Sequence, residues 1–310
     1  MRNGPLGDVM KVWLYAAASV LLGAWISPLV YNSGKALAEV SSGRQTNGPL
    51  RRLADVCREA EFPGFFAASL ILAAVILFLP FGEWFGGGRR QGGVAKLAPY
   101  VLPGDLLRRN PHGPRQAVVG FTVAVLAFLL AEGFALRGIL GMETSGKFIL
   151  RALAVAVGWA LLQEILFRGI ATGVFLKALR PAAALGMSAG LFALLHFLNP
   201  APGINVADPD VAGVGFELLG KIITQFINPQ AFVTGFLPLL ALGAALAYAR
   251  WRTASLWLPT GLHAGWIFAN TLSGPNTNSL IQGLTPVFSI ILIGIFTAHL
   301  THADAPETAP

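Results

Sequence analysis

Charged residues are scarce in this sequence. Only 12% of its 310 residues are Asp, Glu, Lys or Arg, whereas 55% are hydrophobic and the mean hydropathy is +0.64. Soluble domains carry about 25% charged residues. The composition therefore excludes an ordinary soluble domain and predicts a protein that crosses a membrane several times.

The sequence has a single cysteine and lacks one common metalloprotease signature. Cys57 is the only cysteine, so no intramolecular disulfide can form. The sequence has no H-E-x-x-H motif, which excludes the zincin arrangement. The net charge is +7, but no basic cluster lies on a soluble domain, so nucleic acid is not an expected partner. In a membrane protein, a basic excess is typical of cytoplasmic loops beside anionic lipid, and the lipid bilayer is the expected partner.

Long hydrophobic runs are abundant. A span needs about 20 apolar residues, and eight such runs lie near residues 12–30, 62–81, 117–136, 148–176, 182–198, 231–249, 254–272 and 280–298. Each should be a helix, because backbone polar groups in lipid must be paired internally. We predict an all-α polytopic membrane protein with about eight transmembrane helices in one bundle. Residues 1–310 would form a single domain, with a disordered tail over 299–310.

The connections between spans carry two further predictions. Lys and Arg are more frequent in the segments that would be inside if the N-terminus were inside, which predicts cytoplasmic termini. The compact loops favour a bacterial inner membrane. A short amphipathic helix is expected within residues 31–61. In the connection 199–230, apolar residues recur at helical spacing and predict either an interfacial helix or a lid; these are Phe216, Leu219, Ile223 and Phe226.

Four ionisable residues interrupt three of the apolar runs. Glu164 and Arg168 are four residues apart in the run 148–176, so they share a helix face and can pair. His196 and His263 each lie in a separate run, and all four fall near the middle of the membrane. Such residues are costly in lipid and usually functional. A structural ion pair and two core histidines remain the alternative.

These groups allow three kinds of function. A glutamate with a histidine can deprotonate a water for peptide hydrolysis, while a second histidine or an asparagine stabilises the oxyanion. The same residue types could instead bind Zn²⁺ through Glu164, His196 and His263, with water as the fourth ligand. A non-enzymatic protein could use the buried polar groups to bind or translocate a small solute or protons.

Three motifs, in order along the chain, carry a resemblance to a known family. They are Gln163-Glu164-x-x-x-Arg168, Phe192-x-x-x-His196 and a later His263. This pattern resembles the CPBP family, the CAAX-protease and bacteriocin-processing intramembrane peptidases, over about residues 148–272. The resemblance implies an eight-helix endopeptidase acting on a peptide or a membrane-tethered protein. Glutamate and histidine would activate water, histidine and asparagine would hold the oxyanion, and no metal would be needed.

The sequence departs from that pattern at two positions. The residue usually given the base role in the family is glutamate, but here it is Gln163, whose neutral amide cannot accept a proton. Either Glu164 takes over this role, or the chain is impaired, or the substitution is an engineered one. The asparagine or aspartate expected four residues after His263 is Ile267, and Asn270 is the nearest candidate. The predicted catalytic set is Gln163, Glu164, Arg168, His196, His263 and Asn270.

Overall fold

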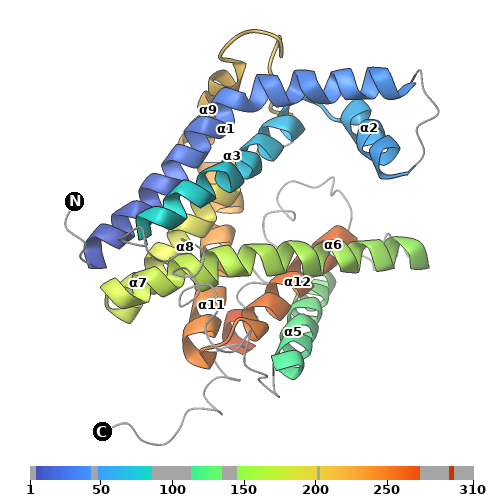
Figure 1. The fold of residues 1–310 in the computed structure, drawn as a ribbon. Helices are drawn as coiled ribbons and strands as arrows, with labels where there is room; N and C mark the ends of the chain where they lie inside the picture. The colour runs from blue at the N-terminus through green and yellow to red at the C-terminus, as the bar shows by residue number, and fades with distance from the viewer. Residues whose placement is uncertain are drawn as a thin grey trace, which may run out of the picture. The chain divides into compact units, whose positions relative to one another are not determined.

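The computed structural model describes residues 5–42, 48–85, 113–134, 145–200, 203–272 and 293–296. Within these residues the regular structure is helical and contains no strand, which confirms the all-α prediction (Figure 1). Of the predicted eighth span, 280–298, only residues 293–296 are described, and they are helical. The predicted disordered tail, 299–310, lies outside the described residues.

Several of the described helices can cross a membrane. Four are long and apolar enough by length and composition, namely Leu6–Ser41, Gly113–Ala131, Gly146–Ala178 and Pro229–Thr253. Two shorter apolar helices, Phe62–Leu77 and Pro181–Phe197, also coincide with predicted spans. The protein is therefore an integral membrane protein, as its composition indicates.

The chain divides into two compact units by its internal contacts. One comprises Met10–Val94 and Leu195–Pro229; we call it the N-terminal unit. The other comprises Met1–Val9, Ala95–Leu194 and Gln230–Pro310; we call it the site unit because it contains Glu164, Arg168 and His263. Each is described by itself below.

The N-terminal unit is built on α1 (Pro5–Ser42), α2 (Pro49–Glu59), α3 (Phe62–Phe85) and α9 (Val214–Thr224). α1 extends well past the predicted span and bends along its length (Figure 1), with Pro28 inside the helix. Proline removes one backbone hydrogen bond and kinks a helix. The amphipathic helix predicted within 31–61 is α2, which buries Ala54 and Cys57 and exposes its arginines.

The helix expected within residues 199–230 is α9, and it exposes two of the apolar residues that predicted it. Phe216 and Ile223 are 42% and 49% exposed. The face that α9 buries is formed by Val214, Gly215, Leu218, Leu219 and Ile222. The reason is a close approach to α1, because a Cβ at Gly215 would clash with the Ala24 carbonyl oxygen. Backbone contact at a glycine, and not the largest apolar side chains, therefore orients α9.

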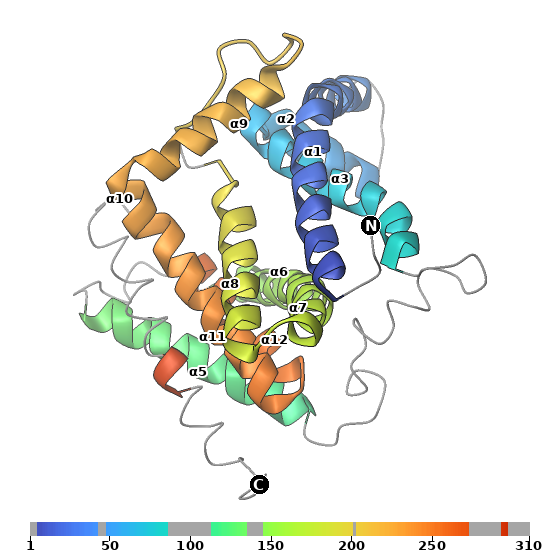
Figure 2. The ribbon, with the colours of Figure 1, turned by 90° about the vertical axis from the view of Figure 1, so that its left-hand side faces the viewer.

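Within its described residues, the site unit contains two continuous helical rods, three further labelled helices and the short helical segment 293–296. One rod joins α6 (Gly146–Glu164), the π-helical segment η2 (Ile165–Ala171) and α7 (Thr172–Ala178), in agreement with the predicted span 148–176. The other joins α10 (Pro229–Ala231), the π-helical segment η4 (Phe232–Phe236) and α11 (Leu237–Thr253) (Figure 2). The remaining helices are α5 (Gly113–Phe134), α8 (Pro181–Phe197) and α12 (Trp257–Leu272).

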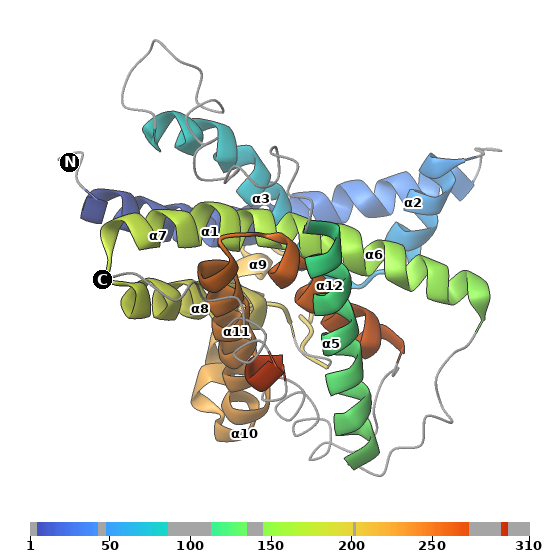
Figure 3. The ribbon, with the colours of Figure 1, turned by 90° about the horizontal axis from the view of Figure 1, so that it is seen from below.

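Glycines bring α5 and α12 into backbone contact. The two helices lie side by side (Figure 3). A Cβ at Gly261 would clash with the Ala117 carbonyl oxygen, and one at Gly265 would lie 2.5 Å from the Phe121 carbonyl oxygen. Small residues allow such close approach between membrane helices, where association depends on van der Waals packing. This contact fixes α12, the helix that carries His263.

We expect Gly261→Ala to lower the free energy of unfolding by about 1–3 kcal/mol, the usual cost of overpacking. The new methyl group would meet backbone atoms of α5, which cannot rotate away as a side chain could. Reversible unfolding in detergent, followed by circular dichroism, would measure the loss. Gly158→Ala on α6 is the matched control, because a Cβ there meets nothing within 4 Å. Equal stability of the two variants would contradict the close α5–α12 contact.

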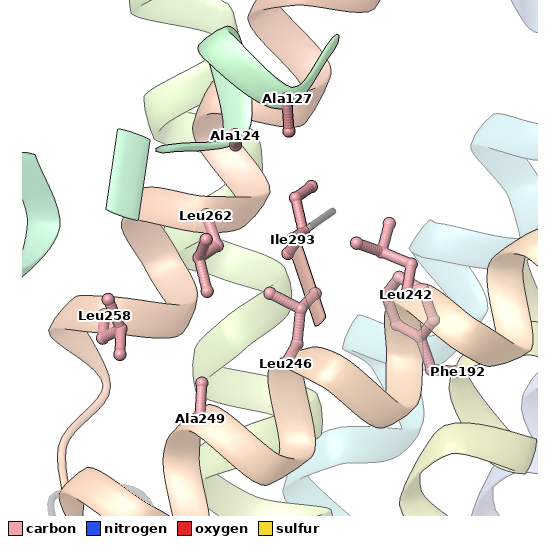
Figure 4. Close-up of a cluster of buried hydrophobic side chains, with 9 residues drawn as sticks. All are labelled: Ala124, Ala127, Phe192, Leu242, Leu246, Ala249, Leu258, Leu262 and Ile293. Atoms are coloured by element: carbon pink, nitrogen blue, oxygen red, sulfur yellow. The ribbon is translucent and has the colours of Figure 1, made fainter. Parts of the chain in front are cut away.

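An apolar cluster packs between α5, α8, α11 and α12 (Figure 4). Its buried members are Ala124, Ala127, Phe192, Leu242, Leu246, Ala249, Leu258, Leu262 and Ile293. Phe167, from the π segment of the first rod, packs against this cluster. Phe192 belongs to both this cluster and the polar site, so the site is built directly against a dry core.

Candidate functional site

Two of the predicted charged residues form an ion pair inside the first rod. Glu164 is the last residue of α6, and Arg168 lies one helical turn further on, within the π segment. Both side chains are 0% exposed, and Arg168 Nη1 lies 3.2 Å from Glu164 Oε1. The pairing predicted from the spacing is confirmed. Each charge is costly to bury alone, so the two stabilise each other.

His263 of α12 completes a three-residue cluster. Its Nδ1 lies 2.7 Å from the same carboxylate oxygen, Glu164 Oε1, and the residue is only 2% exposed. A single oxygen therefore has an arginine on one side and an imidazole on the other. Residues 99 positions apart in the sequence meet at this point, which links the first rod to α12.

The Arg168 guanidinium has further contacts on its other sides. Its Nη2 donates a hydrogen bond of 3.2 Å to the Gly243 carbonyl oxygen of α11. Its central carbon lies 4.3 Å from the centroid of the Phe192 ring. A cation over an aromatic face is worth about 2 kcal/mol or more when both are desolvated. Arg168 therefore ties together the first rod, α8 and α11.

Phe192 supports both ionisable neighbours of Glu164. Its ring is fully buried and meets the His263 ring edge to face, with centroids 5.6 Å apart. A second edge-to-face contact, at 5.3 Å, joins it to Phe167. The sequence assigned no catalytic role to Phe192. Its signal was its place in the Phe192-x-x-x-His196 motif, but the motif did not show that the ring contacts Arg168.

Buried polar atoms remain without a hydrogen bond within the described part of the chain. Three of them belong to this cluster, namely Glu164 Oε2, Arg168 Nε and Arg168 Nη1, the last in ionic contact with Glu164 but outside hydrogen-bond geometry. Leaving a buried polar atom unpaired usually costs about 1–3 kcal/mol. A cluster that keeps such atoms is not optimised for stability alone, which is typical of functional sites.

The π-helical segment was not predicted from the sequence. Thr172 donates both its backbone N–H and its hydroxyl to the Phe167 carbonyl oxygen, five residues earlier, the hydroxyl at 2.9 Å. The same hydroxyl lies 2.6 Å from Ser188 Oγ on α8. π-helical turns occur often at functional sites. Here the π segment contains Arg168 and begins directly after Glu164.

The remaining predicted residues differ in their positions. Gln163 lies next to Glu164 near the end of α6 and is 9% exposed, more than any member of the cluster. His196 is half-buried in the last turn of α8, in the part of that helix assigned to the N-terminal unit, so its place beside the cluster stays a prediction. Asn270 is exposed near the end of α12 and lies outside the buried cluster. Among the described residues, no group of three or more His, Cys, Asp and Glu is arranged to hold a metal.

Comparison with known proteins places this cluster within a recognised domain. Neither the curated proteins nor the solved structures gave a match. A family model described as Type II CAAX prenyl endopeptidase Rce1-like matches residues 145–269. That range contains Gln163, Glu164, Arg168, His196 and His263, but not Asn270. Residues 145–269 thus form an Rce1-like domain of the CAAX-protease type, and the resemblance to the CPBP family is confirmed.

Proposed function

We propose that the protein is an intramembrane endopeptidase that hydrolyses a peptide bond of a membrane-associated peptide or protein. One observation carries the proposal: a fully buried carboxylate joins an arginine and a histidine from different helices, inside the segment that matches the CAAX-protease family. Ionisable groups held at membrane depth are expensive and are retained for function.

The burial of the three clustered residues supports different roles for them. Glu164 is fully enclosed, and its Oε1 is occupied by two partners, so it is better suited to hold His263 in place than to meet a substrate. Arg168 neutralises that carboxylate and anchors it to α11 through Gly243. Gln163, at 9% exposed the least buried residue of the cluster region, and His263, whose second ring nitrogen is not used by Glu164, are the residues that we assign to the substrate side. His196 would help to position the attacking water.

The proposed substrate and setting follow from the same residues and from composition. A peptide or membrane-tethered protein fits a hydrolytic site at membrane depth, and the lipid bilayer is the other partner; no nucleic acid is involved. The mechanism uses acid–base groups of the chain and needs no metal. We place the protein in a bacterial inner membrane with both termini in the cytoplasm, because Lys and Arg are enriched in the corresponding segments.

The test is cleavage of a peptide library by the purified protein in detergent and in liposomes, read by mass spectrometry. We expect discrete cleavage products from the unaltered chain or from its Gln163→Glu variant. His196→Ala should reduce them by about 10²-fold, the usual cost of misplacing a reacting group. Lys221→Ala, at an exposed ion pair of α9, is the control that should cleave normally.

Two results would overturn this proposal. One is the absence of cleavage by both the unaltered chain and Gln163→Glu, with each protein folded. The other is cleavage that persists unchanged in His196→Ala and Glu164→Ala, which would show a contaminating protease. The binding or transport of a small solute or of protons would then be examined with loaded liposomes.

A further inference from the structure

The bond between His263 and Glu164 determines which ring nitrogen of His263 carries hydrogen. An ionised carboxylate can only accept hydrogen bonds, and Arg168, 3.2 Å from the same oxygen, balances its charge. Nδ1 of His263 lies 2.7 Å from that oxygen and must therefore be the donor. In a neutral imidazole, the other nitrogen, Nε2, then has a lone pair and no hydrogen.

This tautomer is unsuited to hold an oxyanion. An oxyanion must be met by donors, whereas in the neutral ring, the form that a general base requires, Nε2 is an acceptor. The same nitrogen is well suited to remove a proton from water, as in other hydrolases where a carboxylate orients a histidine. The family resemblance implied that His263 stabilises the oxyanion, so the geometry and that assignment disagree.

Two departures in the sequence agree with the geometry. Ile267 stands where the family has the second oxyanion residue, and the alternative, Asn270, is exposed. Gln163 stands where the family has its base, and an amide can donate hydrogen bonds but cannot take a proton. Nε2 of His263 is therefore an acceptor where the family pattern has a donor. The Gln163 amide is a donor where the family pattern has a base.

We propose that the two roles are exchanged in this chain: His263 is the general base, Glu164 is its positioning residue, and the Gln163 amide binds the oxyanion. The proposal rests on the endopeptidase function proposed above. It makes the unaltered chain a working enzyme, with no need for a glutamate at position 163.

The reaction balances with these three side chains. The water oxygen bonds to the carbonyl carbon while one water proton passes to Nε2 of His263, and the carbonyl electron pair moves onto oxygen, where the Gln163 N–H donates to it. The resulting imidazolium is held by the Glu164 carboxylate. It then returns its proton to the leaving nitrogen as the carbon–nitrogen bond breaks, which regenerates neutral His263 and releases an acid and an amine.

The variant His263→Gln separates a base from a donor, because glutamine can donate a hydrogen bond but cannot accept a proton. We expect kcat to fall by about 10²–10⁴-fold if His263 is the base. Retention of activity within about tenfold would overturn the exchange. Thermal unfolding of the same variant checks that it folds, since the glutamine can still bond Glu164.

The variant Gln163→Glu tests the other half of the exchange. Loss of an oxyanion donor lowers kcat by about 10²–10³-fold, so we expect this variant to be slower than the unaltered chain. A faster variant would overturn the exchange and leave the endopeptidase function intact. If neither form cleaves any peptide, the proposed function itself fails and the exchange fails with it.

Nitrogen-15 NMR of labelled histidine gives a readout that needs no substrate. The His263 signal is identified by its absence from His263→Gln, and we expect it to show a hydrogen on Nδ1 and a bare Nε2. Glu164→Gln should alter this signal. A glutamine amide can both donate and accept a hydrogen bond, so it does not determine which ring nitrogen of His263 carries hydrogen. A hydrogen on Nε2 in the neutral ring of the unaltered chain would overturn the proposal.

Discussion

Replacing Arg168 with alanine should lower the free energy of unfolding by about 3–5 kcal/mol, the cost of removing one partner from a buried ion pair. Glu164 would lose its cation in a site that is fully closed to water, with only His263 left beside it. The bond to the Gly243 carbonyl and the contact with the Phe192 ring would be lost as well. Folding yield and unfolding in detergent would both report the change.

A matched pair on the protein surface provides the control. Lys221 and Glu217 are also four residues apart and lie 2.8 Å from each other, but both are well exposed. Lys221→Ala should change stability by no more than about 1 kcal/mol, as for other exposed pairs. Arg168→Lys should restore folding better than activity, because lysine lacks the planar fork that reaches both Glu164 and Gly243. Normal stability of Arg168→Ala would show that the pair is not formed.

The second large effect is expected at Phe192. Phe192→Ala should lower the free energy of unfolding by about 3–5 kcal/mol, as for other buried phenylalanines. The ring is fully buried and contacts Arg168, His263 and Phe167. Its removal would leave a cavity beside a buried cation, so packing and the cation–π contact are lost together. Chemical unfolding of the purified variant in detergent would measure the loss.

Two further variants separate the sources of this effect. Phe192→Leu keeps most of the apolar volume but has no ring, so its loss should be close to the cation–π contribution, about 2 kcal/mol. Phe268→Ala, at a half-buried ring of α12 that contacts Phe121, should cost less than Phe192→Ala. If Phe192→Leu were as stable as the unaltered chain, the ring would contribute volume alone.

The sequence was sufficient to predict most of the helices and the ion pair between Glu164 and Arg168. Seven of the eight apolar runs that were predicted to be spans fall within described helices. Backbone polar groups in lipid must be paired within the segment, so an apolar run of this length has to be helical. The spacing of Glu164 and Arg168 predicted their pairing, since it needs only the period of one helix. Both predictions depend on local properties of the chain.

Contacts between distant segments could not be predicted in the same way. The bonds from Glu164 to His263 and from Arg168 to the Gly243 carbonyl depend on how three helices pack. The large apolar residues of α9 predicted a helix but not which face it buries, and Gly215 lies at the contact with α1 that sets this face. A glycine carries no apolar signal in a sequence, although it decides where two backbones can touch.

The π segment of the first rod has a consequence for how this chain can change over time. The segment lies between two attachments to other helices. Glu164, at its upstream end, bonds His263, and Thr172, at its downstream end, contacts Ser188. A deletion within the segment can be absorbed when its π-helical bonds tighten to α-helical ones, but inserting one residue between them would turn the downstream half by about 100° relative to the upstream half. Only one of the two attachments could then be kept. Substitutions between Glu164 and Thr172 are therefore far easier to accommodate than insertions, and this interval can shorten by one residue more readily than it can lengthen.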